Sequence, residues 1–440
     1  MQHFDVIIIG GRPAGASLAI RLAQQHLNVL LVDKATFPSL PSVPSSPMIH
    51  VGTMRLLDEL GLNEHDYTYS GGKFTHFTMD YIDMFDVKIS IEDAGLERAY
   101  HYGLDRTRFD TVLWNHASSQ PTVSAKSDFS VTDILRDEDG LVNGISGKNA
   151  EGIVEKFTAD LVIGADGRFS FAARKFGAAK VLEFNEYATA SYHAEWENVE
   201  PYSAEYPASV TICNFGTGFF VLCIPIDDHK YIIATYSRAE NGRVGAQNVE
   251  AEYRKAVESI PALRARLRNA RLVSRVVGVN PIENGYREGV GPGWALVGDA
   301  LHYKDPIDGQ GIYDALMGSK LLAEAIYKWK HEGVEWMEAG EEFEIRFRDA
   351  SYPMLQQTVA RSKQELTPAP KLILNTLVRW MLNDPEFQRN FVRYYGRVLD
   401  PADFNPKPTG GMILRGIVND VRRYLASRQG APAVREAPVS

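Results

Sequence analysis

The sequence predicts an α/β fold that joins a parallel sheet to a separate antiparallel sheet and a helical C-terminal region. Three observations carry this prediction. A short apolar run at 4–9, a glycine-rich turn with a small-residue helix, and a second apolar run at 28–32 form the pattern of a β-α-β unit. Runs rich in β-forming residues alternate with turns from about 185 to 240, which indicates antiparallel strands. Residues 335 to 428 are largely helical in pattern, with breaks at prolines.

Length and composition limit the fold and its partners. A chain of 440 residues that is 45% hydrophobic exceeds one simple domain, so two or three lobes are expected. The formal net charge of −9, without a basic block, argues against nucleic acid or an anionic membrane as the main partner. The N-terminus lacks a signal-peptide pattern, and no run approaches the ~20 apolar residues of a membrane span. We therefore expect a cytoplasmic protein without stable membrane insertion.

Two residue types exclude other classes of protein. Cys213 and Cys223 do not form a Cys-x-x-Cys pair, which removes the dithiol disulfide reductases, and both are expected to be small buried hydrophobes. None of the 11 histidines has a His-x-x-x-His or similar metal-ligand spacing. We therefore expect no metal centre.

The first motif joins the first strand to its helix, and it consists of Gly10, Gly11, Arg12, Pro13, Ala14 and Gly15. Glycines in such a turn let a dinucleotide pyrophosphate approach the helix N-terminus, where unpaired N–H groups favour negative charge. Asp33 ends the next strand, before Lys34, and is placed to accept hydrogen bonds from an adenosine ribose. Arg12 replaces the central glycine of the usual pattern, and its guanidinium either crowds the pyrophosphate or binds it. A tight turn without a ligand is the alternative.

Two later motifs also follow apolar strands. Asp166 and Gly167 end a strand that begins near Asp160, although an exposed Asp-Gly turn is common in proteins without a ligand. The third motif ends a strand at Gly298 and Asp299 and continues through the residues Pro306, Gly309, Gln310, Gly311 and Ile312. Asp299 can accept hydrogen bonds from a polyol chain. Backbone N–H groups at the following helix N-terminus would stabilise negative charge on a reduced flavin.

The three motifs in this order resemble the FAD-binding fold of the p-hydroxybenzoate hydroxylase superfamily. That superfamily includes aromatic hydroxylases, geranylgeranyl reductases and flavin-dependent halogenases. The resemblance covers residues 1 to about 335 and implies a Rossmann-like FAD-binding domain with an inserted antiparallel β-sheet substrate domain. The expected boundaries are 1–75, 101–180 and 276–334 for the FAD-binding domain, 76–100 and 181–275 for the substrate domain, 335–429 for the helical region and 430–440 for a disordered tail.

The resemblance assigns residues to each part of FAD. Gly10, Gly15 and Asp33 would hold the AMP half, and Arg106 would lie near the pyrophosphate. Asp166 and Gly167 would contact FAD in a motif that hydroxylases link to NAD(P)H use. Asp299 would bind the ribityl chain, and the isoalloxazine ring would lie against Pro306, Gly309 and Gly311. The expected cofactor-binding residues are Gly10, Arg12, Pro13, Ala14, Gly15, Asp33, Lys34, Arg106, Asp166, Gly167, Gly298, Asp299, Pro306, Gly309, Gln310, Gly311 and Ile312.

The resemblance implies a FAD-dependent monooxygenase that uses NAD(P)H and O2. It would hydroxylate or epoxidise a small apolar or aromatic substrate through a flavin C4a-hydroperoxide. NADH or NADPH would donate the electrons, directly or through a reductase. Arg174 falls four residues after Ser170 where many hydroxylases have three, a departure that bears on direct nicotinamide use.

Other functions stay open. One is a carbon–carbon double-bond reductase of the geranylgeranyl reductase type, and another is a non-redox binding protein with a structural flavin. A halogenase is disfavoured, because the tryptophan pair expected before Ile-Pro is absent from residues 220–225. The sequence leaves the oligomeric state undecided.

Flavin monooxygenation needs few acids or bases from the protein, so only weak catalytic candidates are expected. His50 ends a Pro/Ser-rich loop and is either a substrate or flavin contact or a loop histidine satisfied by backbone. His193 lies in an expected strand, where successive side chains point to opposite faces, so His193 points away from the face of Tyr192 and Ala194. Either face of that strand can line the substrate cavity. Asp305 could relay a proton or lie in a solvated loop.

Overall fold

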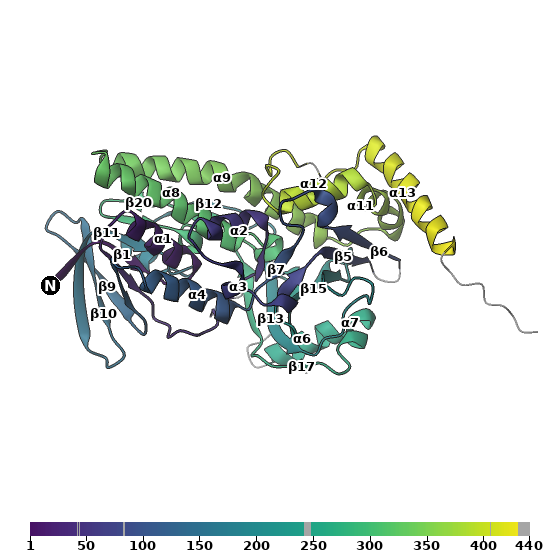
Figure 1. The fold of residues 1–440 in the computed structure, drawn as a ribbon, viewed down its shortest axis with the longest axis horizontal. Coiled ribbons are helices and arrows are strands. Elements are labelled where there is room, and N and C mark those ends of the chain that lie inside the picture. The colour runs from purple at the N-terminus through teal and green to yellow at the C-terminus, as the bar shows by residue number, and fades with distance from the viewer. Residues whose placement is uncertain (42, 44, 82–83, 242–247, 405, 430–440) are drawn as a thin grey trace, which may run out of the picture.

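The computed structural model describes residues 1–429 apart from 42, 44, 82–83, 242–247 and 405, and it confirms the expected α/β fold class. The parallel sheet lies towards one end of the molecule and the antiparallel sheet towards the other (Figure 1). The expected tail at 430–440 lies outside the described residues.

Five parallel strands form the centre of the first sheet, in the order β21-β11-β1-β2-β8. Their bounds are Trp294–Leu296, Val154–Gly164, Gln2–Ile9, Val29–Val32 and Val123–Lys126. Antiparallel strands extend this sheet, namely β9 (Ser130–Arg136), β10 (Val142–Lys148) and β20 (Val290–Gly291). Residues 6–9 and all of β2 are buried, which explains their uninterrupted apolar runs.

Helices cover the parallel sheet. They are α1 (Pro13–Gln24), α4 (Arg106–Ser118), α5 (Phe171–Phe176), α8 (Gly311–His331) and α9 (Trp336–Glu365). Helices α1 and α8 pack closely, with the Ser17 and Ser319 hydroxyl oxygens 2.7 Å apart. This packing brings the N-terminal motif and the late α8 motif to one region of the sheet.

The second sheet has the strand order β17-β13-β16-β15-β14-β5-β6, and β18 pairs with β13. The bounds are β5 (His76–Tyr81), β6 (Phe85–Ser90), β13 (Thr189–Glu197), β14 (Ser209–Cys213), β15 (Phe219–Pro225), β16 (Lys230–Arg238), β17 (Arg271–Leu272) and β18 (Val277–Ile282). One pair, β14 with β5, is parallel. The sheet therefore combines two separated parts of the chain.

Each face of the second sheet is covered. Helices α6 (Val249–Glu258) and α7 (Pro261–Arg266) enclose one cluster with Ala194 and Trp196. Cys213 and Cys223 lie in this cluster as free, buried thiols, as expected. On the other face, apolar sheet residues pack with the C-terminal helices.

The C-terminal region continues beyond α9 as several helices. They are α10 (Lys371–Ile373), the π-helical segment η5 (Leu374–Val378), α11 (Arg379–Leu382), α12 (Pro385–Tyr395) and α13 (Gly410–Gln429). In Figure 1 these helices lie beside β5 and β6. Among the described residues, no helix combines the length and apolar character needed to cross a bilayer.

Short elements connect these parts. They are β3 (Met48–Ile49), α2 (Val51–Asp58), α3 (Glu64–Tyr67), η1 (Ser70–Gly72), β4 (Lys73–Phe74), η2 (Glu92–Ala94), β7 (His101–Gly103), β12 (Lys180–Glu183), β19 (Gly285–Arg287), η3 (Gly298–Ala300), β22 (His302–Tyr303) and η4 (Pro306–Asp308). Two of them, η3 and η4, carry the third sequence motif.

Candidate functional site

The turn between β1 and α1 needs glycine for close packing. Gly10 has a φ of 109°, and a Cβ there would lie 2.5 Å from the Ala165 carbonyl oxygen. A Cβ at Gly15 would lie 1.8 Å from the Gly10 carbonyl oxygen. Helix α1 has no side-chain cap and no acidic residue in its first turn, which leaves its N-terminal N–H groups for an anion.

Asp33 holds this turn in place. Its Oδ2 accepts a hydrogen bond of 2.7 Å from the Gly11 N–H, and its Oδ1 accepts one of 2.7 Å from Ala35. Each carboxylate oxygen has two lone pairs, so both can accept a further bond from a ribose hydroxyl. Lys34 is exposed beside it.

Arg12 does not lie free over the turn, because it forms an ion pair with Asp110 of α4. Arg106 donates two hydrogen bonds of 3.0 Å to the same buried carboxylate, and it also bonds the Ser45 hydroxyl. The single carboxylate of Asp110 thus pairs with the guanidinium groups of both Arg12 and Arg106, which leaves one net positive charge in this cluster. This charge lies beside the uncapped start of α1, which suits a diphosphate.

The Asp166 carboxylate stabilises the start of α5. Its carboxylate accepts hydrogen bonds of 2.6 Å from the Phe171 N–H and 3.1 Å from the Ala172 N–H, and it also accepts one from the Ser170 hydroxyl. These bonds pair the first two N–H groups of α5, whose N-cap residue is Ser170. Gly167 has a φ of 83° and open space where a Cβ would project. The backbone of this turn, rather than the Asp166 carboxylate, is therefore free to contact a cofactor.

Asp299 has a different environment. Gly298 packs so closely on the first motif that a Cβ there would lie 2.7 Å from the Ala14 Cβ. Burial raises the pKa of the Asp299 carboxyl, and within the described residues no group donates a hydrogen bond to that carboxyl. A half-buried carboxylate to which no described group donates a hydrogen bond fits the hydroxyls of a polyol chain.

The turn that precedes α8 brings the remaining residues together. Pro306 begins η4, and Gly309 has a φ of 69°. Helix α8 has no side-chain cap, and a Cβ at Gly311 would meet open space. The Ile312 side chain is buried, and so is that of Gln310. The residues present therefore fit FAD, with an anion site at α1, an acceptor at Asp299 and an open, uncapped helix start at α8.

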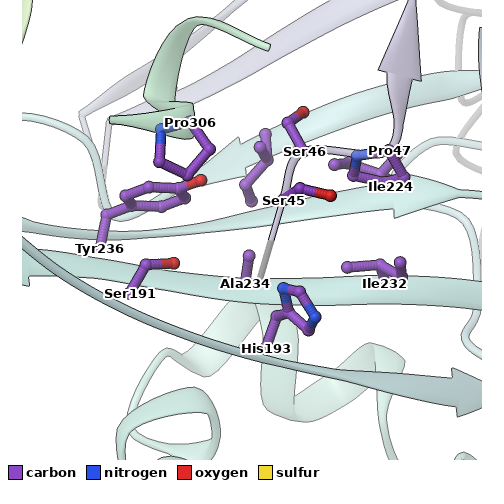
Figure 2. Close-up of a pocket in the computed structure, with 11 residues that line it drawn as sticks. Ser45, Ser46, Pro47, Ser191, His193, Ile224, Ile232, Ala234, Tyr236 and Pro306 are labelled. Carbon is purple, nitrogen blue, oxygen red and sulfur yellow. The ribbon is translucent and has the colours of Figure 1, made fainter. Parts of the chain in front are cut away.

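A narrow cavity lies between the antiparallel sheet and this turn (Figure 2). It is lined by Ser45, Ser46, Pro47, Ser191, His193, Leu222, Ile224, Ile232, Ala234, Tyr236 and Pro306. Its volume is about 10 Å³, near the minimum that holds one water. Figure 2 shows Ser191, His193 and Tyr236 projecting from the strands towards Ser45 and Pro306. No charged side chain belongs to this described lining.

The structure separates the three catalytic candidates. His193 lines the cavity, whereas Ala194 on the opposite face packs under α6 and α7. Burial and the nearby Arg106 lower the pKa of His193 to about 4, so its imidazole is neutral at pH 7. Neither His50 nor Asp305 is among the lining residues.

Asp305 and His50 are both buried in the protein. Burial raises the pKa of Asp305 to about 6, and its carboxyl accepts hydrogen bonds from the Thr189 hydroxyl and from the Ile307 N–H at 2.9 Å. The alternative of a solvated loop is therefore wrong for Asp305. His50 Nε2 lies 3.0 Å from Gln310 Oε1, a side chain rather than backbone, whereas the buried His50 Nδ1 has no partner among the described residues. Burial lowers the pKa of His50.

Sequence reasoning missed several residues of this region. Asp110 lies four residues after Arg106 on α4, and this helical spacing was the available signal. Ser191 and Tyr236 lack such a signal, because only the pairing of β13 with β16 brings them together. Among the described residues there is no group of histidine, cysteine, aspartate and glutamate suited to a metal ion.

Comparison with known proteins agrees with this geometry. The model of the FAD binding domain family matches residues 3–333. Digeranylgeranylglycerophospholipid reductase from Methanospirillum hungatei is 26% identical over 325 residues, which are 73% of this chain and 75% of that protein.

Two solved structures share the fold. A flavin-dependent brominase has a TM-score of 0.70 at 21% identity, covering 97% of this chain and 100% of that chain. The p-nitrophenol 4-monooxygenase from Pseudomonas putida has a TM-score of 0.73 at 15% identity, covering 90% of this chain and 99% of that one. At these identities the structures are evidence for the fold alone.

Proposed function

This chain belongs to the FAD binding domain family, and from that premise we propose that it is a FAD-dependent monooxygenase acting on a small apolar or aromatic substrate. NADH or NADPH would donate the electrons, directly or through a reductase. The chain is a flavoenzyme by family, and the proposal concerns its reaction.

The observation that carries the proposal is the narrow cavity at Pro306. Its lining includes the apolar side chains of Leu222, Ile224 and Ile232, and its described part contains no charge. A small, largely apolar substrate suits such a site better than a long chain does. Because the volume is about 10 Å³, substrate entry must displace part of the lining, and the parts of the lining outside the sheet are the loop residues 45–47 and Pro306.

Different residues of the chain would bind FAD and exclude water. The α1 turn, Arg12 and Arg106 would bind the diphosphate, and Asp299 would accept hydrogen bonds from the ribityl hydroxyls. When bound, reduced FAD supplies the electrons that activate O2. The apolar part of the cavity lining would exclude water from the substrate.

Polar groups at the cavity would orient the substrate. Neutral His193 has one N–H donor and one nitrogen acceptor, and the Ser191 and Tyr236 hydroxyls lie on the same face. Asp305, with its pKa raised to about 6, is able to hold or release a proton near neutral pH beside Pro306.

The test is oxygen dependence. The purified holoprotein is supplied with NADH or NADPH and a panel of small aromatic and alkene substrates, in air and under anaerobic conditions. The proposal predicts an oxygenated product that forms only with O2 and carries ¹⁸O from labelled O2. A product that forms equally without O2 would contradict it. A flavin that NAD(P)H reduces only when a separate reductase is added would assign the electron route.

A second candidate is a carbon–carbon double-bond reductase. The observation in its favour is the relative from Methanospirillum hungatei, which is named as a reductase of a digeranylgeranyl lipid. This function predicts anaerobic reduction of an alkene by the reduced protein, with no requirement for O2. The brominase likeness motivates one further control, in which bromide is omitted from and added to the aerobic assay. A brominated product would contradict both the monooxygenase and the reductase and would indicate a halogenase.

A further inference from the structure

A buried polar network lies behind the turn that leads into α8. Its centre is Arg397, which follows α12 in the C-terminal region, beyond the residues 3–333 that match the family model. Arg397 Nε donates a hydrogen bond of 2.8 Å to Gln310 Oε1, and Arg397 Nη2 donates one of 3.0 Å to Asp314 Oδ1. The side chain of Arg397 is only 4% exposed. The C-terminal region therefore reaches the first turn of α8.

Gln310 is held on every side. Its Oε1 accepts from Arg397 and from His50 at 3.0 Å, and its Nε2 donates to the Tyr395 carbonyl oxygen at 3.0 Å. Because Arg397 can only donate, the amide orientation is fixed, and His50 must donate through Nε2. With its side chain committed to this network, Gln310 presents only its backbone to the proposed flavin.

The network is balanced in charge. Lys304 Nζ lies 3.1 Å from Asp308 Oδ2 and 2.7 Å from Asp314 Oδ2, so two buried carboxylates meet the two cations Lys304 and Arg397. Burial alone would raise the pKa of Asp314, but Lys304 and Arg397 hold it below its usual value. Removal of one cation would leave a buried negative charge without full compensation.

The turn itself depends on this network. The Asp308 carboxylate accepts a hydrogen bond of 3.1 Å from the Gln310 N–H and another from the Thr358 hydroxyl of α9. Arg397 has a φ of 58°, a costly conformation for a residue other than glycine, which indicates that surrounding contacts hold it there. Movement of Arg397 would therefore release both Gln310 and the start of α8.

We propose that Arg397 is a positioning residue for the flavin. By holding Gln310 and Asp314, it fixes the segment from Pro306 to Gly311 and keeps the local charge balanced, so that the α8 N-terminus faces the isoalloxazine ring. This inference rests on the proposed FAD site, but not on the reaction performed there. It gives the C-terminal helical region the function of completing the cofactor site.

The experiment compares three variants with the wild-type holoprotein in its oxidised state, without substrate. Arg397→Met removes the positive charge and its hydrogen bonds. Arg397→Lys restores the charge, and Gln310→Met removes the hydrogen bonds of the Gln310 amide and keeps the charge of Arg397. The control is Arg415→Met, which also breaks a C-terminal pair to a buried carboxylate, that of Asp384 at 2.8 Å. The FAD dissociation constant, the midpoint potential and the unfolding temperature are measured for each.

Arg397→Met is expected to raise the FAD dissociation constant at least about tenfold. It should also lower the midpoint potential, because the extra buried negative charge disfavours an anionic reduced flavin. Arg397→Lys should recover the potential, and Gln310→Met should weaken FAD binding with a smaller change in potential. Arg415→Met should change only the unfolding temperature.

Two results would overturn the proposal. One is that the Arg397 and Gln310 variants bind FAD with wild-type affinity and potential. The other is that their effects equal those of Arg415→Met, which would make Arg397 merely structural. If Arg397→Met yields no folded protein, Arg397→Lys and Gln310→Met decide the question by the same two measurements. A wild-type protein that binds FAD but oxygenates nothing contradicts the proposed reaction and leaves this inference standing.

Discussion

Gly15 lies so close to Gly10 that a Cβ at position 15 would come within 1.8 Å of the Gly10 carbonyl oxygen. This contact lets α1 begin directly on the turn after β1, where its uncapped N-terminus can face an anion. The sequence motif and the cofactor site are therefore connected by a steric requirement.

Gly15→Ala should disrupt this turn. The added methyl group cannot be accommodated without moving backbone, so FAD affinity is expected to fall at least about tenfold, with a loss of stability of about 1–3 kcal/mol. Titration with FAD and urea unfolding measure the two effects. Gly410→Ala is the control, because a Cβ there meets open space. Equal behaviour of the two variants would contradict the steric account.

Gly311→Ala tests the start of α8 separately. A Cβ at this position meets no described atom within 4 Å, so the apoprotein should be as stable as the wild type. The proposed isoalloxazine ring would fill this space, so the same methyl group should weaken FAD binding. Thermal unfolding of the apoprotein and FAD titration are the readouts. Unchanged FAD affinity would place the ring elsewhere.

Asp305→Asn should alter the pH dependence of stability. The folded-state pKa of Asp305 is raised to about 6, above the value of about 3.9 expected when unfolded. Protonated Asp305 therefore stabilises the folded state fully below pH ~4. As the pH rises through 6 this stabilisation is lost, which lowers the free energy of unfolding by up to about 3 kcal/mol. In the Asp305→Asn variant the free energy of unfolding should not fall in this way. Urea unfolding of the variant and the wild type at pH 5 and pH 7.5 measures the difference. A wild-type advantage that grows with pH would refute the assignment.

His101→Phe should stabilise the protein. Both ring nitrogens of His101 are buried without a partner in the described part of the chain, and burial lowers the pKa of His101 to about 3. Phenylalanine removes the unsatisfied groups, so the free energy of unfolding should rise by about 1–2 kcal/mol at pH 7.

The gain at His101 should grow as the pH falls below 6.5, because the unfolded wild type then takes up a proton that the folded state excludes. Exposed His65 supplies the control, and His65→Phe should show no comparable gain. A His101→Phe variant less stable than wild type would mean that the ring has a partner, such as bound cofactor or water.

Local signals allowed much of the fold to be predicted from sequence. The apolar run at 4–9 and the helix at Pro13 are set by neighbouring residues, and β1 and α1 lie where these signals place them. The outward face of β13 could not be predicted, because both faces of its sheet are covered. Only the packing of Ala194 under α6 and α7 assigns His193 to the cavity.

The site also depends on contacts that spacing does not reveal. Arg12 pairs with Asp110 across 98 residues, and Gln310 pairs with Arg397 across 87 residues. The first pair forms where α1 packs on α4, and the second where the segment after α12 meets the start of α8. The sequence motifs therefore indicated a cofactor turn but not the side chains that hold it. Asp166 illustrates the converse, because its motif suggested a cofactor contact while its carboxylate caps α5.

The most direct test of the account is the visible absorbance spectrum of the purified protein, followed by release and identification of the chromophore. The account predicts a yellow protein that contains FAD in equal amount with the chain and retains it through gel filtration. A colourless protein that takes up no added FAD would contradict it.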